Sequence, residues 1–88
     1  MPTSPSEPRA LAAVVLGDEL TVTLADGRRI TVPLSWFPRL QRATPAQRQH
    51  LELLGEGQGI HWPDVDEDLS IDGILRGVKA PGGSQRAR

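Results

Sequence analysis

Apolar and polar side chains alternate with a period of two along residues 20–24 and 30–34, the pattern of half-buried β-strands. Between these runs lies Ala25-Asp26-Gly27. A two-residue Asp-Gly loop would put the two apolar rows on opposite faces, whereas a three-residue loop puts them on one face. The pattern therefore predicts a three-residue hairpin with Gly27 in the left-handed position of a G1 bulge. Its expected pairs are Leu24 with Arg28, Val22 with Ile30 and Leu20 with Val32.

An earlier apolar run, residues 11–16, precedes Gly17-Asp18, a plausible tight turn. The register that this turn sets places Leu11, Ala13 and Val15 beside Leu24, Val22 and Leu20, so the three strands form a meander with one apolar face. Val14 and Leu16 then lie on the opposite face. Because the first strand is apolar on both sides, we expect a helix or another subunit to cover this second side.

Short helices are predicted downstream of the meander. Residues 35–40 (SWFPRL) read as a short irregular helix whose aromatic side chains cap one end of the core. Thr44-Pro45-Ala46-Gln47 combines an N-cap, a proline at the first helical position and a capping box. We expect this helix to run to about Leu54, to stop at Gly55 and to bury Leu51 and Leu54.

The last third of the chain predicts a fourth strand and a final helix. Residues 57–62 (GQGIHW) read as the strand, and residues 64–69 follow as an acidic loop. Ser70 is the expected N-cap of a short helix with Asp72 in its first turn. The predicted fold class is α+β: a small antiparallel meander of three strands plus a fourth later strand, packed with two or three short helices.

Composition limits the chain to one domain and sets its boundaries. Residues 1–9 are rich in Pro and Ser, and residues 80–88 consist mostly of Pro, Gly, Ser, Ala and Arg, so we expect disordered tails around a folded unit of residues 10–79. No stretch approaches the ~20 apolar residues of a membrane span. Cysteine is absent. We therefore expect a small soluble protein of the cytoplasm, without disulfides or thiolate metal sites.

Candidate catalytic and metal-binding residues are few. His50 reads as an exposed residue of the predicted helix, and His61 is the better candidate base because acids follow it closely. No cysteine nucleophile accompanies it, and no serine has the context of a nucleophile elbow. Asp64, Asp66 and Asp68 imitate the start of a calcium loop, but Leu69 and Leu75 occupy the positions that need Gly and Glu. We expect no enzyme activity, cofactor or dedicated metal site.

Ile60-His61-Trp62-Pro63, followed by Asp68-Leu69-Ser70, resembles the bacterial family known as domain of unknown function 2442. The 20–22 strand, the Asp26-Gly27 turn and residues 32–34 agree with this resemblance, which covers about residues 12–77. It implies an α+β fold with a small meander and no agreed activity. Some members resemble domains fused to a helix-turn-helix, and some are encoded beside suspected toxins, which implies an antitoxin-like role. We expect no helix-turn-helix after residue 79 and no nucleic-acid binding.

Charge distribution supplies the functional hypothesis. Residues 27–51 hold five arginines and no acid, whereas residues 62–75 hold five acids and no Lys or Arg. We expect a non-catalytic module whose acidic loop binds a basic partner protein. The alternatives are a homodimer formed through Val14 and Leu16, and a weak metal binder or small enzyme that uses His61. The residues expected at the partner surface are Trp62, Asp64, Asp66, Glu67, Asp68 and Asp72.

Overall fold

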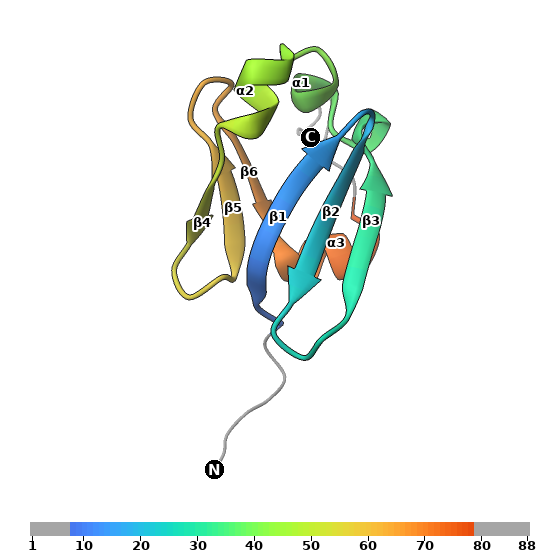
Figure 1. Ribbon diagram of the computed structural model, residues 1–88, viewed down its shortest axis with the longest axis vertical. Helices are drawn as coiled ribbons and strands as arrows, with labels where there is room; N and C mark the ends of the chain where they lie inside the picture. The colour runs from blue at the N-terminus through green and yellow to red at the C-terminus, as the bar shows by residue number, and fades with distance from the viewer. Residues whose placement is uncertain (1–7, 79–88) are drawn as a thin grey trace, which may run out of the picture.

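The computed structural model describes residues 8–78 as two small antiparallel sheets with short helices at their ends (Figure 1). Sheet A has the order β1-β2-β3, and sheet B has the order β4-β5-β6. The tails expected at 1–9 and 80–88 lie outside the described residues, except for Pro8 and Arg9. The strands are β1 (Ala10–Leu16), β2 (Glu19–Leu24), β3 (Arg29–Pro33), β4 (Glu52–Leu54), β5 (Gly59–Trp62) and β6 (Glu67–Ser70). The helices are η1 (Leu34–Trp36), α1 (Pro38–Gln41), α2 (Pro45–Gln49) and α3 (Ile71–Leu75).

The β2–β3 hairpin has the predicted register and turn. Leu20 pairs with Val32 and Val22 with Ile30. The Leu24 amide donates to the Arg28 carbonyl at 2.8 Å. Gly27 has a φ of +98°, as a left-handed turn position requires. The three-residue loop predicted from the alternation is therefore confirmed. Only this loop length places the apolar residues of both strands on the same face.

The predicted register of β1 is right at its centre and wrong at its start. Ala13 pairs with Val22 and Val15 with Leu20, but Ala10 takes the expected place of Leu11 beside Leu24. A bulge between Ala10 and Ala12 shifts the register and turns Leu11 outward, where 64% of its surface is exposed. The bulge is stabilised from outside the strand, since the Ala10 amide donates to the Gly57 carbonyl at 2.7 Å.

The expected helix over residues 44–54 is shorter than predicted, and a second sheet follows it. The capping box of Thr44 and Gln47 is present, yet α2 ends at Gln49. Leu53 then pairs with Ile60 as part of β4, where it packs against the core. Two glycines with positive φ, Gly55 and Gly57, turn the chain into β5. Strand pairing places Leu53, partly buried, against the core, whereas Leu54, which was expected to be buried, is 39% exposed.

The acidic segment is also more ordered than a loop. Its second half, Glu67–Ser70, forms β6 and pairs with β5, so only residues 63–66 connect the two strands. Ser70 N-caps α3 as predicted, because its hydroxyl accepts from the Gly73 amide at 2.9 Å. The predicted later strand at 57–62 therefore belongs to a separate three-stranded sheet.

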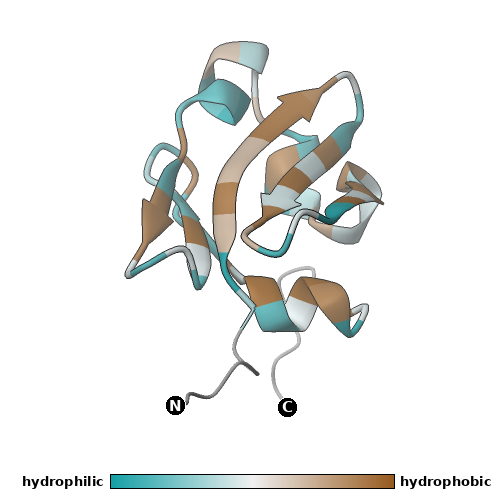
Figure 2. Ribbon diagram, turned by 60° about the horizontal axis from the view of Figure 1, so that its bottom comes forward, coloured by the Kyte–Doolittle hydropathy of each residue, from teal (hydrophilic) through white to brown (hydrophobic). Residues whose placement is uncertain are grey.

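One hydrophobic core lies between the two sheets and their helices. Its fully buried side chains come from all parts of the described chain: Trp62, Phe37, Leu20, Leu24, Leu34, Leu40, Ile60, Ile71, Val15 and Val22. Phe37 is buried and meets Trp36 edge to face, with ring centroids 6.3 Å apart. In Figure 1, α3 passes behind the strands of sheet A. Figure 2 shows apolar residues recurring along the strands and in α3.

The expected cover over the outer side of β1 is missing from residues 8–78. Val14 is 39% exposed and Leu16 is 66% exposed. Both point away from the core, as the alternation predicts. The first strand therefore presents aliphatic side chains on a face that no described element covers.

Candidate protein-binding surface on sheet B

Sheet B has one buried face and one exposed face, because its strands alternate. On β5, Ile60 and Trp62 face the core, so Gly59 and His61 face outward. The pairing of β4 and β6 with β5 places their alternate residues on the same side. We call this side the outer face of sheet B: Glu52, Leu54, Gly59, His61, Asp68 and Ser70.

A carboxylate, an imidazole and a second carboxylate lie in one row across this face. Glu52 pairs with His61, and His61 pairs with Asp68. Nδ1 of His61 is hydrogen-bonded to Oδ1 of Asp68. This hydrogen bond raises the pKa of His61, and the negative charges of Asp68, Glu52 and Asp66 raise it further against the opposing effect of desolvation. The imidazole is therefore stabilised as a cation by the acids around it.

An open groove of about 530 Å³ lies beside the row. Gly59 on the middle strand β5 forms the floor of the groove, because it has no side chain to fill the space between β4 and β6. Leu54 leans over the glycine, since a Cβ at position 59 would lie 3.5 Å from Leu54 Cδ1. Asp68 and Ser70 border the opposite side. The groove therefore combines an aliphatic wall, Leu54, with a carboxylate at its rim, Asp68. A single long side chain of a partner could contact both.

The connection between β5 and β6 is held by contacts to the helical end of the molecule. Arg39 on α1 donates from Nη1 to the Asp66 carbonyl at 2.8 Å, and its Nε lies 3.9 Å from Glu67 Oε1. Asp66 has a φ of +55°, the left-handed conformation that tight turns need. Burial raises the pKa of Glu67, while the Arg39 charge lowers it. Arg39 therefore fixes the loop and partly offsets the charge of Glu67.

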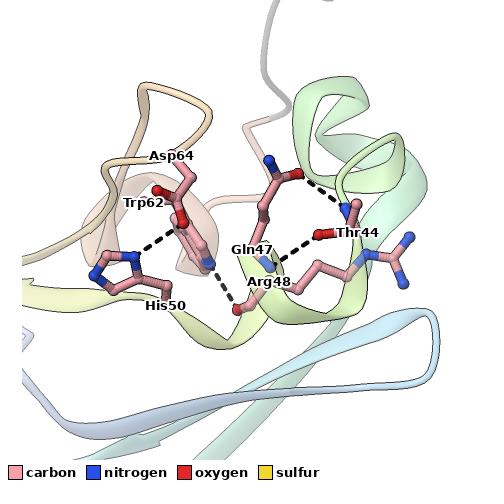
Figure 3. A network of polar contacts seen from close by, with 6 residues as sticks. All are labelled: Thr44, Gln47, Arg48, His50, Trp62 and Asp64. Carbon is pink, nitrogen blue, oxygen red and sulfur yellow. Dashed lines mark hydrogen bonds and ion pairs between the residues drawn. The ribbon is translucent and has the colours of Figure 1, made fainter.

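Trp62 anchors the start of the same loop from inside the core. Its Nε1 donates to the Arg48 carbonyl at 3.0 Å (Figure 3). The Arg48 guanidinium in turn donates to the carbonyls of Leu40, Gln41 and Gly17. Figure 3 also shows the α2 capping box beside this contact and His50 Nδ1 bonded to Asp64 Oδ2 at 2.9 Å. Arg48 and His50 therefore hold Trp62 and Asp64 in place.

The fold partly neutralises the acidic segment 62–75 by pairing its carboxylates with basic side chains. Four of the five acids in residues 62–75 have a basic partner: Asp64 with His50, Glu67 with Arg39, Asp68 with His61 and Asp72 with Arg76. Two of these partners are histidines, which carry charge only when protonated. Residues 51–70, which make up sheet B and its turns, still contain six acids and no Lys or Arg.

The surface residues expected from the sequence divide into three groups. Asp64, Asp66 and Asp68 are exposed around sheet B. Trp62 is 0% exposed and Glu67 is 8% exposed, so these two side chains support the surface from below. Asp72 is exposed on α3 and pairs with Arg76 at 3.1 Å, outside the row and the groove.

Sequence reasoning did not identify Glu52, Leu54 and Gly59 as residues of the outer face of sheet B. Glu52 and Leu54 were placed in the helix that the structure ends at Gln49. The available signal was Gly55-x-Gly57, because glycines two apart are typical of a tight turn between strands. In the described part of the chain, no group of three or more His, Cys, Asp or Glu is arranged to hold a metal ion. No helix among residues 8–78 is long and apolar enough to cross a membrane.

Comparison with known protein families shows which family the folded part of the chain belongs to. Residues 10–80 match the family described as "Protein of unknown function (DUF2442)". The chain belongs to the DUF2442 family. The match spans both sheets and α3, and it agrees with the resemblance carried by the Trp62-Pro63 and Asp68-Leu69-Ser70 segments. The DUF2442 unit therefore includes the whole outer face of sheet B.

Two solved structures share this fold. A protein of unknown function from Rhodospirillum rubrum ATCC 11170 is 32% identical, with a TM-score of 0.77 over 85% of this chain and 93% of that one. An uncharacterised protein from Chromobacterium violaceum is 22% identical, with a TM-score of 0.71 over 82% of this chain and 68% of that one. No curated protein matches the chain. The DUF2442 fold is thus shared with both proteins.

Proposed function

We propose that this DUF2442 chain is a non-catalytic interaction module that binds a basic partner protein through the outer face of sheet B. One observation carries the proposal: sheet B and its turns contain six acids and no Lys or Arg. Exposed carboxylates lie on β4, on the connection between β5 and β6, and on β6: Glu52, Asp64, Asp66 and Asp68. A concentration of one charge sign speeds association with an oppositely charged partner and selects against wrong ones.

The groove supports the same proposal through its shape. Leu54 and the backbone of Gly59 offer an apolar surface, and Asp68 lies at the rim. An arginine or lysine side chain has matching chemistry, because it lays an aliphatic stem on apolar surface while its charged head meets a carboxylate. A basic side chain seated over Gly59, with its head toward Asp68 and Glu52, would use both features.

A toxin-like protein is the specific partner that we propose, and the chain is then antitoxin-like. This version rests on the family resemblance, since some members of the family are encoded beside suspected toxins. A partner that itself binds nucleic acid would carry a basic surface, which fits an acidic surface on this chain. The general proposal holds for any partner with a basic contact surface.

Affinity purification of the chain from its native host, followed by mass spectrometry, would identify the partner. The decisive step is calorimetry with the isolated partner over a salt series. A variant with Glu52→Gln, Asp64→Asn, Asp66→Asn and Asp68→Asn should bind at least about tenfold more weakly at low salt and lose most of the salt dependence. Asparagine suits position 66 because it tolerates positive φ.

The matched control removes acids of sheet A. Glu19→Gln with Asp26→Asn removes two exposed carboxylates that lie outside sheet B and its turns, so it should leave affinity within about twofold. Unchanged binding by the sheet B variant at low salt would reject the proposed surface. Equal loss per charge removed in the two variants would show that binding depends on net charge and not on this surface.

A second candidate is an acid–base site at His61, favoured by its hydrogen bond to Asp68 and by Ser70 on the same face. Ser70 already accepts the α3 cap bond through its hydroxyl oxygen. The raised pKa of His61 also extends the imidazolium form to higher pH, which works against its use as a free base. A metal scan by mass spectrometry and a hydrolase substrate screen, each with His61→Ala as control, test this candidate. A signal that disappears in the variant would support it.

A further inference from the structure

The outer face of sheet A carries three rows of side chains that run across its strands. Pairing registers place Leu16, Glu19 and Pro33 in one row. Val14, Thr21 and Thr31 form the middle row, and Ala12, Thr23 and Arg29 form the third. We call these nine residues the outer face of sheet A. It lies opposite the core and is separate from the surface on sheet B.

The middle row of this face consists of β-branched, uncharged residues. Val14 is the aliphatic member of the middle row. Thr21 Oγ1 and Thr31 Oγ1 lie 2.9 Å apart, where one hydroxyl donates to the other, so each hydroxyl has one partner within the sheet. Burial of the middle row therefore removes methyl groups from water without leaving these hydroxyls unpaired.

The outer face of sheet A carries one acidic and one basic side chain, in its two outermost rows. Glu19 on β2 lies in the row beside the β1–β2 turn, and Arg29 on β3 lies in the row beside the hairpin. Within residues 8–78, neither side chain takes part in a recorded ion pair. An interface between two identical faces requires a pattern that complements itself under a two-fold rotation.

We infer that the outer face of sheet A is the contact between two copies of this chain. A two-fold axis along the middle row sets Val14 opposite Val14 and Leu16 opposite Ala12 of the second copy. Glu19 then lies opposite Thr23 of the second copy, one strand (about 4.8 Å) from its Arg29. The long Arg29 side chain spans that offset, so two ion pairs close the interface symmetrically.

The charges also select this arrangement over its alternative. A two-fold axis parallel to the strands through β2 would place Glu19 directly opposite Glu19 of the second copy. Like charges opposed at an interface are unfavourable. Of these two axes, the one along the middle row brings unlike charges together and sets β1 opposite β1 of the second copy.

The size of the face sets the expected strength of the contact. Three strands at ~4.8 Å spacing and about six residues at ~3.4 Å give a flat area of roughly 300 Å². Stable complexes bury about 800 Å² of accessible surface on each partner. The dimer is therefore weak and reversible, and it forms at high concentration without a requirement for the sheet B partner.

Sedimentation equilibrium of the full chain, from about 10 micromolar to about 1 millimolar, tests this inference. The wild type should show a monomer–dimer equilibrium. Glu19→Arg and Arg29→Glu should each weaken dimerisation by about tenfold or more, and the double variant should recover it, because the ion pairs are restored with exchanged signs. Glu52→Arg on sheet B is the control and should leave dimerisation unchanged. Circular dichroism confirms that each variant is folded.

Cross-linking gives a second measurement that does not depend on the charge variants. The chain has no cysteine, so Val14→Cys introduces a unique thiol. Packed sheets lie about 10 Å apart, a distance that a short bis-maleimide spans. Val14→Cys should be cross-linked to a dimer, and Gln41→Cys on α1 should not. A monomer at every concentration, single charge variants without effect, or a double variant that stays monomeric would overturn the inference.

Discussion

Gly57 joins the two sheets at a point where no side chain fits. Its carbonyl accepts from the Ala10 amide at 2.7 Å, which docks the start of β1 on the β4–β5 turn. A Cβ at position 57 would lie 2.2 Å from the Ala10 carbonyl oxygen, well inside the 3.0 Å limit of real contacts. Gly57 also has a φ of +98°. Gly57→Ala therefore introduces both backbone strain and a collision with backbone.

Gly27 separates these two effects. It has the same φ of +98°, and a Cβ there would meet nothing within 4 Å. Gly27→Ala should therefore lower the free energy of unfolding by the conformational term alone, about 1–2 kcal/mol. Gly57→Ala adds displacement of Ala10, which is buried, and loss of its hydrogen bond, about 1–3 kcal/mol more. The folded unit has only about 4–10 kcal/mol to lose at 0.05–0.15 kcal/mol per residue.

Urea unfolding followed by tryptophan fluorescence measures both variants, because Trp62 is buried in the core. We expect Gly57→Ala to be less stable than Gly27→Ala by about 1–3 kcal/mol. Hydrogen exchange at the Ala10 amide gives a local reading and should accelerate in Gly57→Ala alone. Equal losses of stability in the two variants would refute the proposed docking of β1 on the β4–β5 turn.

Three further predictions concern the helix cap, the imidazole and the loop. Thr44→Ala should lower the free energy of unfolding by about 1 kcal/mol, because it removes the N-cap of α2; urea unfolding with no change would contradict this. The raised pKa of His61 means that its contribution to stability is complete below about pH 6.5 and is lost as pH rises through the folded-state pKa. Unfolding curves of wild type and His61→Gln should therefore converge at alkaline pH, and parallel pH profiles would reject this. Asp66→Gly should raise stability by up to about 1 kcal/mol by relieving positive φ, and a melting temperature below wild type would show that its side chain is needed.

Sheet A could be predicted almost completely from the sequence, because its strands alternate cleanly and one turn length satisfies both apolar rows. The error at Leu11 came from the bulge, which depends on a hydrogen bond to Gly57, a residue 47 positions away from Ala10. No local pattern contains that contact. The caps at Thr44 and Ser70 were also predictable, since capping depends on residues within one helical turn.

Sheet B was less accessible to sequence reasoning. Leu51, Leu53 and Leu54 fit a helix as well as a strand over so short a run, and the strong N-terminal cap favoured extending the helix. The acids at 64, 66 and 68 were identified, but their pairing with histidines and Arg39 required the fold. The groove over Gly59 depends on the β4–β5 pairing that the helix prediction excluded.

The most direct test of the proposed function is amide chemical-shift mapping of the ¹⁵N-labelled chain on addition of the isolated partner. We expect the largest shifts on residues 52–54, 59–61 and 64–70, and we expect them to shrink as salt is raised. The outer face of sheet A should show no more than the small changes of its own weak dimer. Partner-induced shifts centred on sheet A, or shifts on sheet B that do not change with salt, would contradict binding of a basic partner through the outer face of sheet B.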